Sequence, residues 1–196
     1  MFYSSGGGEK MNKKIMFIVA LLAVSLLIPL TLARPWNYPK NNDDFQSFDT
    51  TFSMETPFPT LVIDDSNPNR VVGSWIEEML TYEITVGSET YVLGEDFTYE
   101  GAGVTIGIGA PVTLSGLGLP NGAKETHTRI KYMYDFGDGD GGIDGTLTML
   151  ALRTSGPTRP MNIRSLQGTG DLKNVIIQAT QGAGFTHTGV VKGWPE

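Results

Sequence analysis

Hydrophobic and polar residues alternate with a period of two along much of the chain after residue 45, and this pattern predicts β-strands. The clearest case is the stretch 126–136, in which Arg129 and Lys131 alternate with larger apolar residues. Successive side chains of a strand point to opposite faces, so one face of this strand is expected to be buried. The inward residues are predicted to be Ile130, Tyr132, Tyr134 and Phe136.

A second strand is predicted over the long element 71–86, in which Leu80, Tyr82, Ile84 and Val86 alternate with polar residues. The last part of the chain predicts a hairpin of two strands, 172–180 and 185–191. Gly182 and Gly184 allow the chain to reverse between them, and a Gly-rich turn at 168–171 precedes the first.

About eight short strands, no convincing helix and no internal repeat follow from these patterns. Short strands separated by turns indicate an all-β fold, either an antiparallel β-barrel of about eight strands or a β-sandwich. Glycines inside the stretch 104–119 favour the barrel, because they permit close backbone approach and strong bending.

The turn before the hairpin carries a family resemblance. Gly168, Gly170, Leu172 and Val175 form a G-x-G-x-[F/L]-x-x-[A/V] run that resembles the late hairpin of the allene oxide cyclase and dirigent β-barrels. Those families have another glycine where this chain has Ile177, and the resemblance covers only about the last third of the chain. It implies a closed barrel and, more remotely, an isomerase or cyclase that shapes a reactive apolar substrate.

The N-terminal part predicts a secretory signal peptide. Met11 begins a basic segment that contains Lys13 and Lys14. An apolar run over 15–32 comes next, and the small residue Ala33 ends it. We expect Met11 to be the true start and cleavage to follow Ala33; an uncleaved membrane anchor is the alternative. The predicted organisation is an extension and signal peptide over 1–33, a linker or arm over 34–44, and one β-barrel domain over 45–196.

The net charge and the cysteine content limit the classes of molecule that the protein is expected to bind. The whole chain has 21 acidic and 14 basic residues. Cleavage after Ala33 would remove Glu9, Lys10, Lys13 and Lys14, which leaves 20 acidic and 11 basic residues and a net charge of −9. An acidic surface argues against nucleic acid and anionic membranes as partners after signal cleavage, and suits a secreted or cell-surface protein. The absence of cysteine excludes disulfides and a lipoprotein anchor.

Aromatic residues at strand spacing provide the candidate ligand site. Such stripes are most often core, but in a barrel wide enough for a small molecule they line a pocket. The predicted ligand-binding residues are Tyr82, Tyr99, Tyr132 and Tyr134.

The acidic Gly-rich loop 135–145 provides the candidate metal site. Asp138, Asp140 and Asp144 occupy positions 1, 3 and 7 of a calcium-loop pattern, and carboxylate oxygens suit Ca²⁺. Gly142 and Met149 stand at positions 5 and 12, so the bidentate glutamate is missing. Calcium is therefore the one candidate cofactor, and a solvated acidic hairpin loop is the alternative.

Other chemistry has little support in the sequence. His127 and His187 each lie in a Thr-His-Thr strand without zinc-site spacing, which predicts surface or capping histidines. There is no cysteine and no G-x-S-x-G nucleophile motif. Glu77 and Glu78 are adjacent in a strand and point to opposite faces, so they do not form an acid/base pair.

The expected function follows from these limits. We expect a secreted β-barrel that acts as a non-catalytic binding or cell-surface protein and holds a small apolar ligand. An isomerase or cyclase acting on a small apolar substrate is one alternative. A self-assembling extracellular structural protein, a homo-oligomer, is the other.

Overall fold

The computed structural model describes residues 44–55, 58–115, 118–137, 142–154, 160–182 and 185–196, which all belong to one compact unit, Pro39–Glu196. The predicted signal peptide, and the predicted linker apart from Asp44, lie outside the described residues. Within the described ranges, no helix has the length and apolar character needed to cross a membrane.

The described residues form strands and one short 3₁₀ turn, so the all-β prediction is confirmed. The elements are β1 (Phe45–Met54), β2 (Val62–Asn67), β3 (Arg70–Glu77), β4 (Met79–Val86), β5 (Glu89–Val92), β6 (Thr98–Ile108), β7 (Thr113–Leu114), β8 (Pro120–Asn121), β9 (Glu125–Asp135), β10 (Thr146–Thr154), β11 (Asn162–Gly168), η2 (Gly170–Leu172), β12 (Ile176–Gln181) and β13 (Thr186–Lys192).

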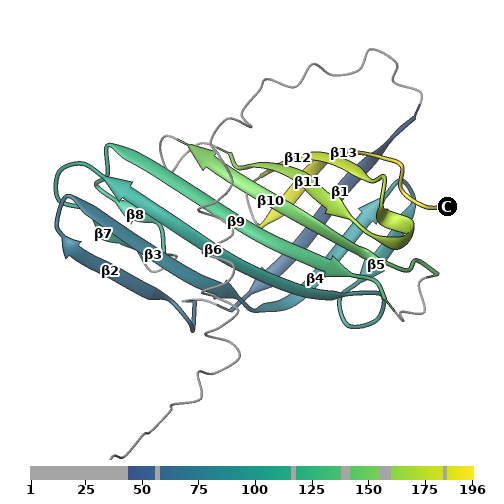
Figure 1. Cartoon of the computed structure of the whole chain (residues 1–196), viewed down its shortest axis with the longest axis horizontal. Coiled ribbons are helices and arrows are strands. Elements are labelled where there is room, and N and C mark those ends of the chain that lie inside the picture. Colours follow the sequence, from purple (N-terminus) through teal and green to yellow (C-terminus); the bar gives the residue numbers. More distant parts are fainter. Residues whose placement is uncertain (1–43, 56–57, 116–117, 138–141, 155–159, 183–184) are drawn as a thin grey trace, which may run out of the picture. The chain divides into compact units, whose positions relative to one another are not determined.

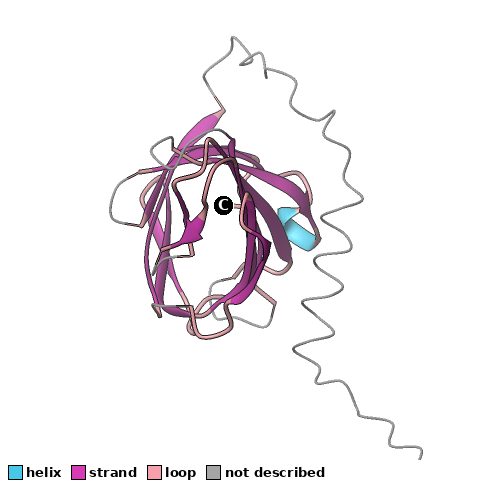
Figure 2. Cartoon of the chain, turned by 90° about the vertical axis from the view of Figure 1, so that its left-hand side faces the viewer, coloured by secondary structure: helices cyan, strands magenta, loops and turns pink. Residues whose placement is uncertain are grey.

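Eleven strands form one antiparallel sheet in the order β2-β3-β6-β9-β10-β11-β12-β13-β1-β4-β5, and β7 pairs with β8 separately. The sheet is curled into a half-barrel (Figures 1 and 2). The sequence predicted about eight strands, and the described sheet has eleven. One reason is that the stretch 71–86 divides into β3 and β4. Leu80, expected on the same face as Tyr82, is exposed because it lies at the start of β4, next to this division.

The division of the stretch 71–86 occurs at a single residue, Glu78. Strand β3 pairs with β6, near one end of the sheet order, while β4 pairs with β1, near the other end. The Glu78 carbonyl accepts a hydrogen bond of 3.1 Å from the backbone N–H of Glu55, at the end of β1. Glu78 therefore connects two regions of the sheet that lie far apart in strand order.

The concave side of the sheet contains an aromatic core. Phe48, Tyr82, Tyr134 and Phe136 come from β1, β4, β9 and the residue after β9, and each is at most 1% exposed. The inward face predicted for the stretch 126–136 is confirmed, since Tyr132 is also buried and Ile130 packs against the same cluster.

Glycines on the inner face of β6 make room for these rings. A Cβ atom at Gly103 would lie 2.2 Å from the indole of Trp75, and one at Gly101 would overlap the Tyr99 ring. Such contacts are impossible for a real side chain, so the two glycines allow Trp75 and Tyr99 to lie flat over the sheet.

The predicted C-terminal hairpin is present, because β12 and β13 pair antiparallel. Its first strand starts later than predicted, however: the residues Gly170–Leu172 form the 3₁₀ turn η2, and β12 begins only at Ile176. The side chain of Leu172 is fully buried. The Asp171 carboxylate accepts a hydrogen bond from the backbone N–H of Asp144, and the backbone N–H of Asp171 donates one to the Asp144 carbonyl. These long-range contacts hold the turn away from extended geometry.

Candidate functional site

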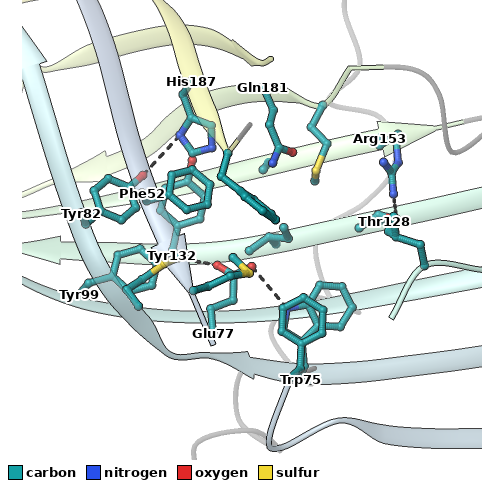
Figure 3. Close-up of a pocket in the computed structure, with 18 residues that line it drawn as sticks. Phe52, Trp75, Glu77, Tyr82, Tyr99, Thr128, Tyr132, Arg153, Gln181 and His187 are labelled. Atoms are coloured by element: carbon teal, nitrogen blue, oxygen red, sulfur yellow. Dashed lines mark hydrogen bonds between the residues drawn. The ribbon is translucent and has the colours of Figure 1, made fainter. Parts of the chain in front are cut away.

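A cavity of about 110 Å³ lies inside the half-barrel (Figure 3). Side chains from β1, β3, β4, β6, β9, β10, β12 and β13 line it, together with residues of the adjoining loops. Most of the lining is aromatic or aliphatic. The polar exceptions are Glu77, Thr128, Arg153, Gln181 and His187, beside the tyrosine hydroxyls.

Three of the four tyrosines predicted to bind a ligand line this cavity: Tyr82, Tyr99 and Tyr132. Tyr134 is fully buried outside the lining, and its hydroxyl lies 2.5 Å from that of Tyr82. The rings of Tyr82 and Tyr99 stack with centroids 5.3 Å apart. The structure therefore brings the four tyrosines together and places Tyr134 as a support for Tyr82.

Glu77 is a buried carboxyl group in this aromatic surrounding, with only 6% of the residue exposed. The Tyr99 hydroxyl donates a hydrogen bond of 2.5 Å to Oε2, and Trp75 Nε1–H donates one of 3.3 Å to Oε1. Burial raises the pKa of Glu77, and the two hydrogen bonds oppose this rise only in part. A carboxyl group that burial shifts towards neutral pH, in a cavity, is a candidate proton donor or acceptor.

Sequence reasoning missed Glu77 as a site residue. It correctly separated Glu77 from Glu78, since Glu77 is buried and Glu78 is not. The available signal was the alternation in β3: Glu77 falls on the same face as the buried residues Val71 and Trp75. A carboxylate in phase with buried apolar residues is unusual and indicates an interior polar group.

The prediction of a surface or capping histidine is wrong for His187. Its side chain is 5% exposed, and its Nδ1 lies 3.3 Å from the Tyr82 hydroxyl. Burial lowers the pKa of His187 to about 4, so the imidazole is neutral at pH 7. His127 is exposed, as predicted, and its strand β9 is not a neighbour of β13 in the sheet.

Arg153 adds a cationic group to the lining. One of its guanidinium nitrogens donates a hydrogen bond of 3.2 Å to the Thr128 hydroxyl, which lies 2.9 Å from the hydroxyl of Thr105. Burial lowers the pKa of Arg153, which remains charged because its ordinary value is so high. The cavity thus has one acidic and one basic side chain among apolar walls.

The predicted calcium ligands are only partly described. Asp138 and Asp140 lie outside the described residues. Asp144 is exposed. Its backbone N–H donates a hydrogen bond of 3.0 Å to Asp171 Oδ2, and its carbonyl accepts a hydrogen bond of 2.8 Å from the backbone N–H of Asp171. Within the described ranges, no three His, Asp or Glu side chains are grouped so that they could hold a metal ion. Calcium binding stays a prediction.

The chemistry available in the cavity is therefore binding of a small apolar molecule, with hydrogen bonds from a few buried groups and proton exchange at Glu77. Comparison of the chain with protein-family models, with curated proteins and with solved structures finds no match.

Proposed function

We propose that this protein binds a small, mainly apolar molecule in the cavity of the half-barrel. The observation that carries the proposal is an aromatic-lined cavity that contains only a few polar side chains, because this composition is typical of small-molecule sites. Stacked pairs such as Phe58 on Trp75, with centroids 4.9 Å apart, give the cavity rigid walls.

The fold proposed around this site is a closed barrel of the allene oxide cyclase type. The one-residue junction at Glu78 supports closure, since it joins strands near the two ends of the sheet order. We also propose that the protein is secreted or displayed at the cell surface. The signal-like segment before Arg34 and the net charge of −9 that follows from its removal support this location.

A cavity-filling substitution tests the binding proposal. Isopropylbenzene should raise the melting temperature of the wild-type protein, because a ligand bound only to the folded state stabilises it. Ala151 lines the cavity, so Ala151→Met should fill part of it and weaken binding of this probe by about tenfold or more. Ala123→Met, which adds the same side chain outside the cavity lining, is the matched control. Equal binding by all three proteins would place the probe elsewhere and contradict the proposal.

A second candidate function is an isomerase that moves a proton within a small apolar substrate, and Glu77 is the observation that favours it. In this reaction the Glu77 carboxylate takes a proton from the carbon next to an existing double bond. The C–H electron pair forms a new double bond to the adjacent carbon, and the old π pair moves to the far atom of the old double bond. Glu77 then returns the proton to a carbon that carries this electron pair, and the pair forms the new C–H bond, so that no atom or electron is gained or lost. Trp75 and Tyr99 act as positioning residues, because both donate hydrogen bonds to the carboxyl group.

Hydrogen–deuterium exchange tests this second candidate. With 2-tetralone as the probe in D₂O, the protein should accelerate exchange of the protons next to the carbonyl, measured by proton NMR. Glu77→Gln should reduce this acceleration about 10²- to 10⁴-fold, the usual contribution of a general base. Glu78→Gln should leave it unchanged, since Glu78 is not part of the lining. Exchange at the uncatalysed rate with the wild-type protein would reject the isomerase and leave the binding proposal standing.

Self-assembly has weaker support. Val62 and Ile63, on the edge strand β2, are 59% and 51% exposed, which favours contact with another chain. Asp64 and Asp65 follow on the same strand, and like charges oppose pairing between two copies of this edge. We therefore favour the cavity as the functional site.

A further inference from the structure

His187 occupies a position in the cavity wall that the preceding functions do not use. It comes from β13, and its ring lies against Phe52 and Tyr132, with centroids 5.0 and 6.1 Å away. Figure 3 shows it across the cavity from Glu77. Nδ1 faces Tyr82, whereas Nε2 makes no hydrogen bond within the described residues. His187 is thus a buried polar group with one nitrogen available to the cavity.

The hydrogen bonds around Tyr82 determine which nitrogen of His187 carries the proton. The Tyr82 hydroxyl lies 2.5 Å from that of Tyr134 and 3.3 Å from Nδ1 of His187, so its single proton serves one of these two contacts. The Thr50 hydroxyl accepts the backbone N–H of His187 at 3.2 Å. We assign the Tyr134 hydroxyl as the donor in the first contact, which leaves the Tyr82 proton for Nδ1 of His187. A neutral imidazole that accepts at Nδ1 carries its proton on Nε2.

We propose that His187 binds an oxygen atom of the ligand through its Nε2–H, and that the ligand is therefore an uncharged carbonyl compound with an apolar body. This inference rests on the proposed binding function of the cavity. A carbonyl oxygen suits the site because it offers lone pairs and brings no further donor that would need a partner. The apolar walls suit the remainder of such a molecule.

The ionisation of His187 supports the same ligand class. Because burial lowers the pKa of His187 to about 4, the ring is a neutral hydrogen-bond donor at pH 7 and provides no counter-charge for an anion. The groups packed around it are Tyr82, Tyr132 and Phe52, which are uncharged at pH 7. At His187 itself, a neutral donor whose ring neighbours are uncharged suits a neutral acceptor; Glu77 and Arg153 are the ionisable groups elsewhere in the lining.

The assignment also gives His187 a role in the proton-transfer candidate. When Glu77 takes a proton from the carbon next to a carbonyl, the C–H electron pair forms the C=C bond and the carbonyl π pair moves to oxygen. The Nε2–H of His187 would stabilise the negative charge on that oxygen by a hydrogen bond, without giving up its proton. A buried carboxylate and a neutral histidine have complementary roles in this type of reaction.

Two probes of similar shape test the inference. Acetophenone labelled with ¹³C at the carbonyl carries the oxygen, and isopropylbenzene lacks it. In the wild-type protein the carbonyl ¹³C signal of bound acetophenone should move downfield, as a hydrogen-bonded carbonyl does. His187→Phe should abolish that shift and weaken acetophenone binding about five- to tenfold, the effect of one neutral hydrogen bond. Binding of isopropylbenzene should change less than twofold.

A second measurement leaves His187 itself unchanged. In a His127→Phe variant, which removes the one other histidine of the chain, the remaining imidazole ¹⁵N signals belong to His187. They should show a proton on Nε2 and a bare Nδ1 at pH 7. Tyr82→Phe removes the donor to Nδ1 and should shift these signals towards a mixture of the two tautomers.

The results distinguish a failure of the role assigned to His187 from a failure of the binding function. If both probes bind and the carbonyl signal is unshifted, or if His187 carries its proton on Nδ1, the inference about His187 is overturned and the binding function stands. If neither probe binds to the wild-type protein, the proposed binding function itself fails, and this inference fails with it.

Discussion

Replacing Gly170 by valine is expected to lower the free energy of unfolding by roughly 3–5 kcal/mol. Gly170 begins the turn η2 with φ of +54°, a conformation that a β-branched residue adopts only at a cost. In addition, a Cβ atom there would lie 2.2 Å from the carbonyl oxygen of Asp144, so the backbone would have to move. The two costs add, because the first arises from the local backbone conformation and the second from the close approach between η2 and Asp144.

A matched control separates these two costs. Gly94 also has positive φ, +86°, but a Cβ atom at that position would have no neighbour within 4 Å. Gly94→Val should therefore cost only the conformational part, roughly 1–3 kcal/mol. Urea unfolding of the two variants and the wild type, followed by circular dichroism, measures the difference. Equal losses in both variants would contradict the close approach of Gly170 to Asp144.

The same turn shows how far the sequence leads. Its glycines and Asp171 predict a turn, and a turn is present. The sequence does not reveal that Asp171 binds the backbone of Asp144, 27 residues earlier, or that Leu172 is buried. Because β-branched residues follow closely, local propensity extends the next strand too far towards the N-terminus. Tertiary contacts decide its true start at Ile176.

The break at Glu78 was present in the pattern as a change of phase. In β3 the buried residues have odd numbers, as Trp75 does, whereas in β4 they have even numbers, as Tyr82 and Ile84 do. One regular strand cannot bury both sets, because its side chains alternate strictly between the two faces. A change of phase within an alternating stretch therefore predicts a bend or bulge.

The candidate site was predictable in its aromatic part and not in its polar part. The tyrosines stand at strand spacing and are visible one strand at a time. His187 acquires its role from Tyr82, 105 residues earlier, and that pairing depends on strand order. Glu77 likewise depends on Tyr99 of β6. Strand alternation shows which face a residue occupies, but only the curled sheet shows which residues meet across the interior.

The burial of His187 also predicts how stability depends on pH. The pKa of this imidazole is lowered to about 4 from an ordinary value of 6.5, so the unfolded chain binds a proton more readily than the folded protein. Stability is therefore lost as the pH falls from 6.5 towards 4. A difference of about 2.5 pKa units corresponds to a loss of about 3 kcal/mol at pH 4.

Other groups titrate in the same range, so the contribution of His187 is measured by difference. Burial raises the pKa of Glu77, which has the opposite effect: it makes folding more favourable as the pH falls. His187→Asn removes the imidazole and keeps an amide that can accept the Tyr82 hydrogen bond, whereas His127→Asn changes an exposed histidine.

Urea unfolding at pH 7 and at pH 4 should show that the wild type and the His127→Asn variant lose about 3 kcal/mol more than the His187→Asn variant does. The comparison uses the change with pH within each protein, so a general destabilisation by the substitution at position 187 does not affect it. An equal loss in all three proteins would mean that the folded state accommodates a protonated His187, and the neutral donor proposed for the cavity would then be rejected.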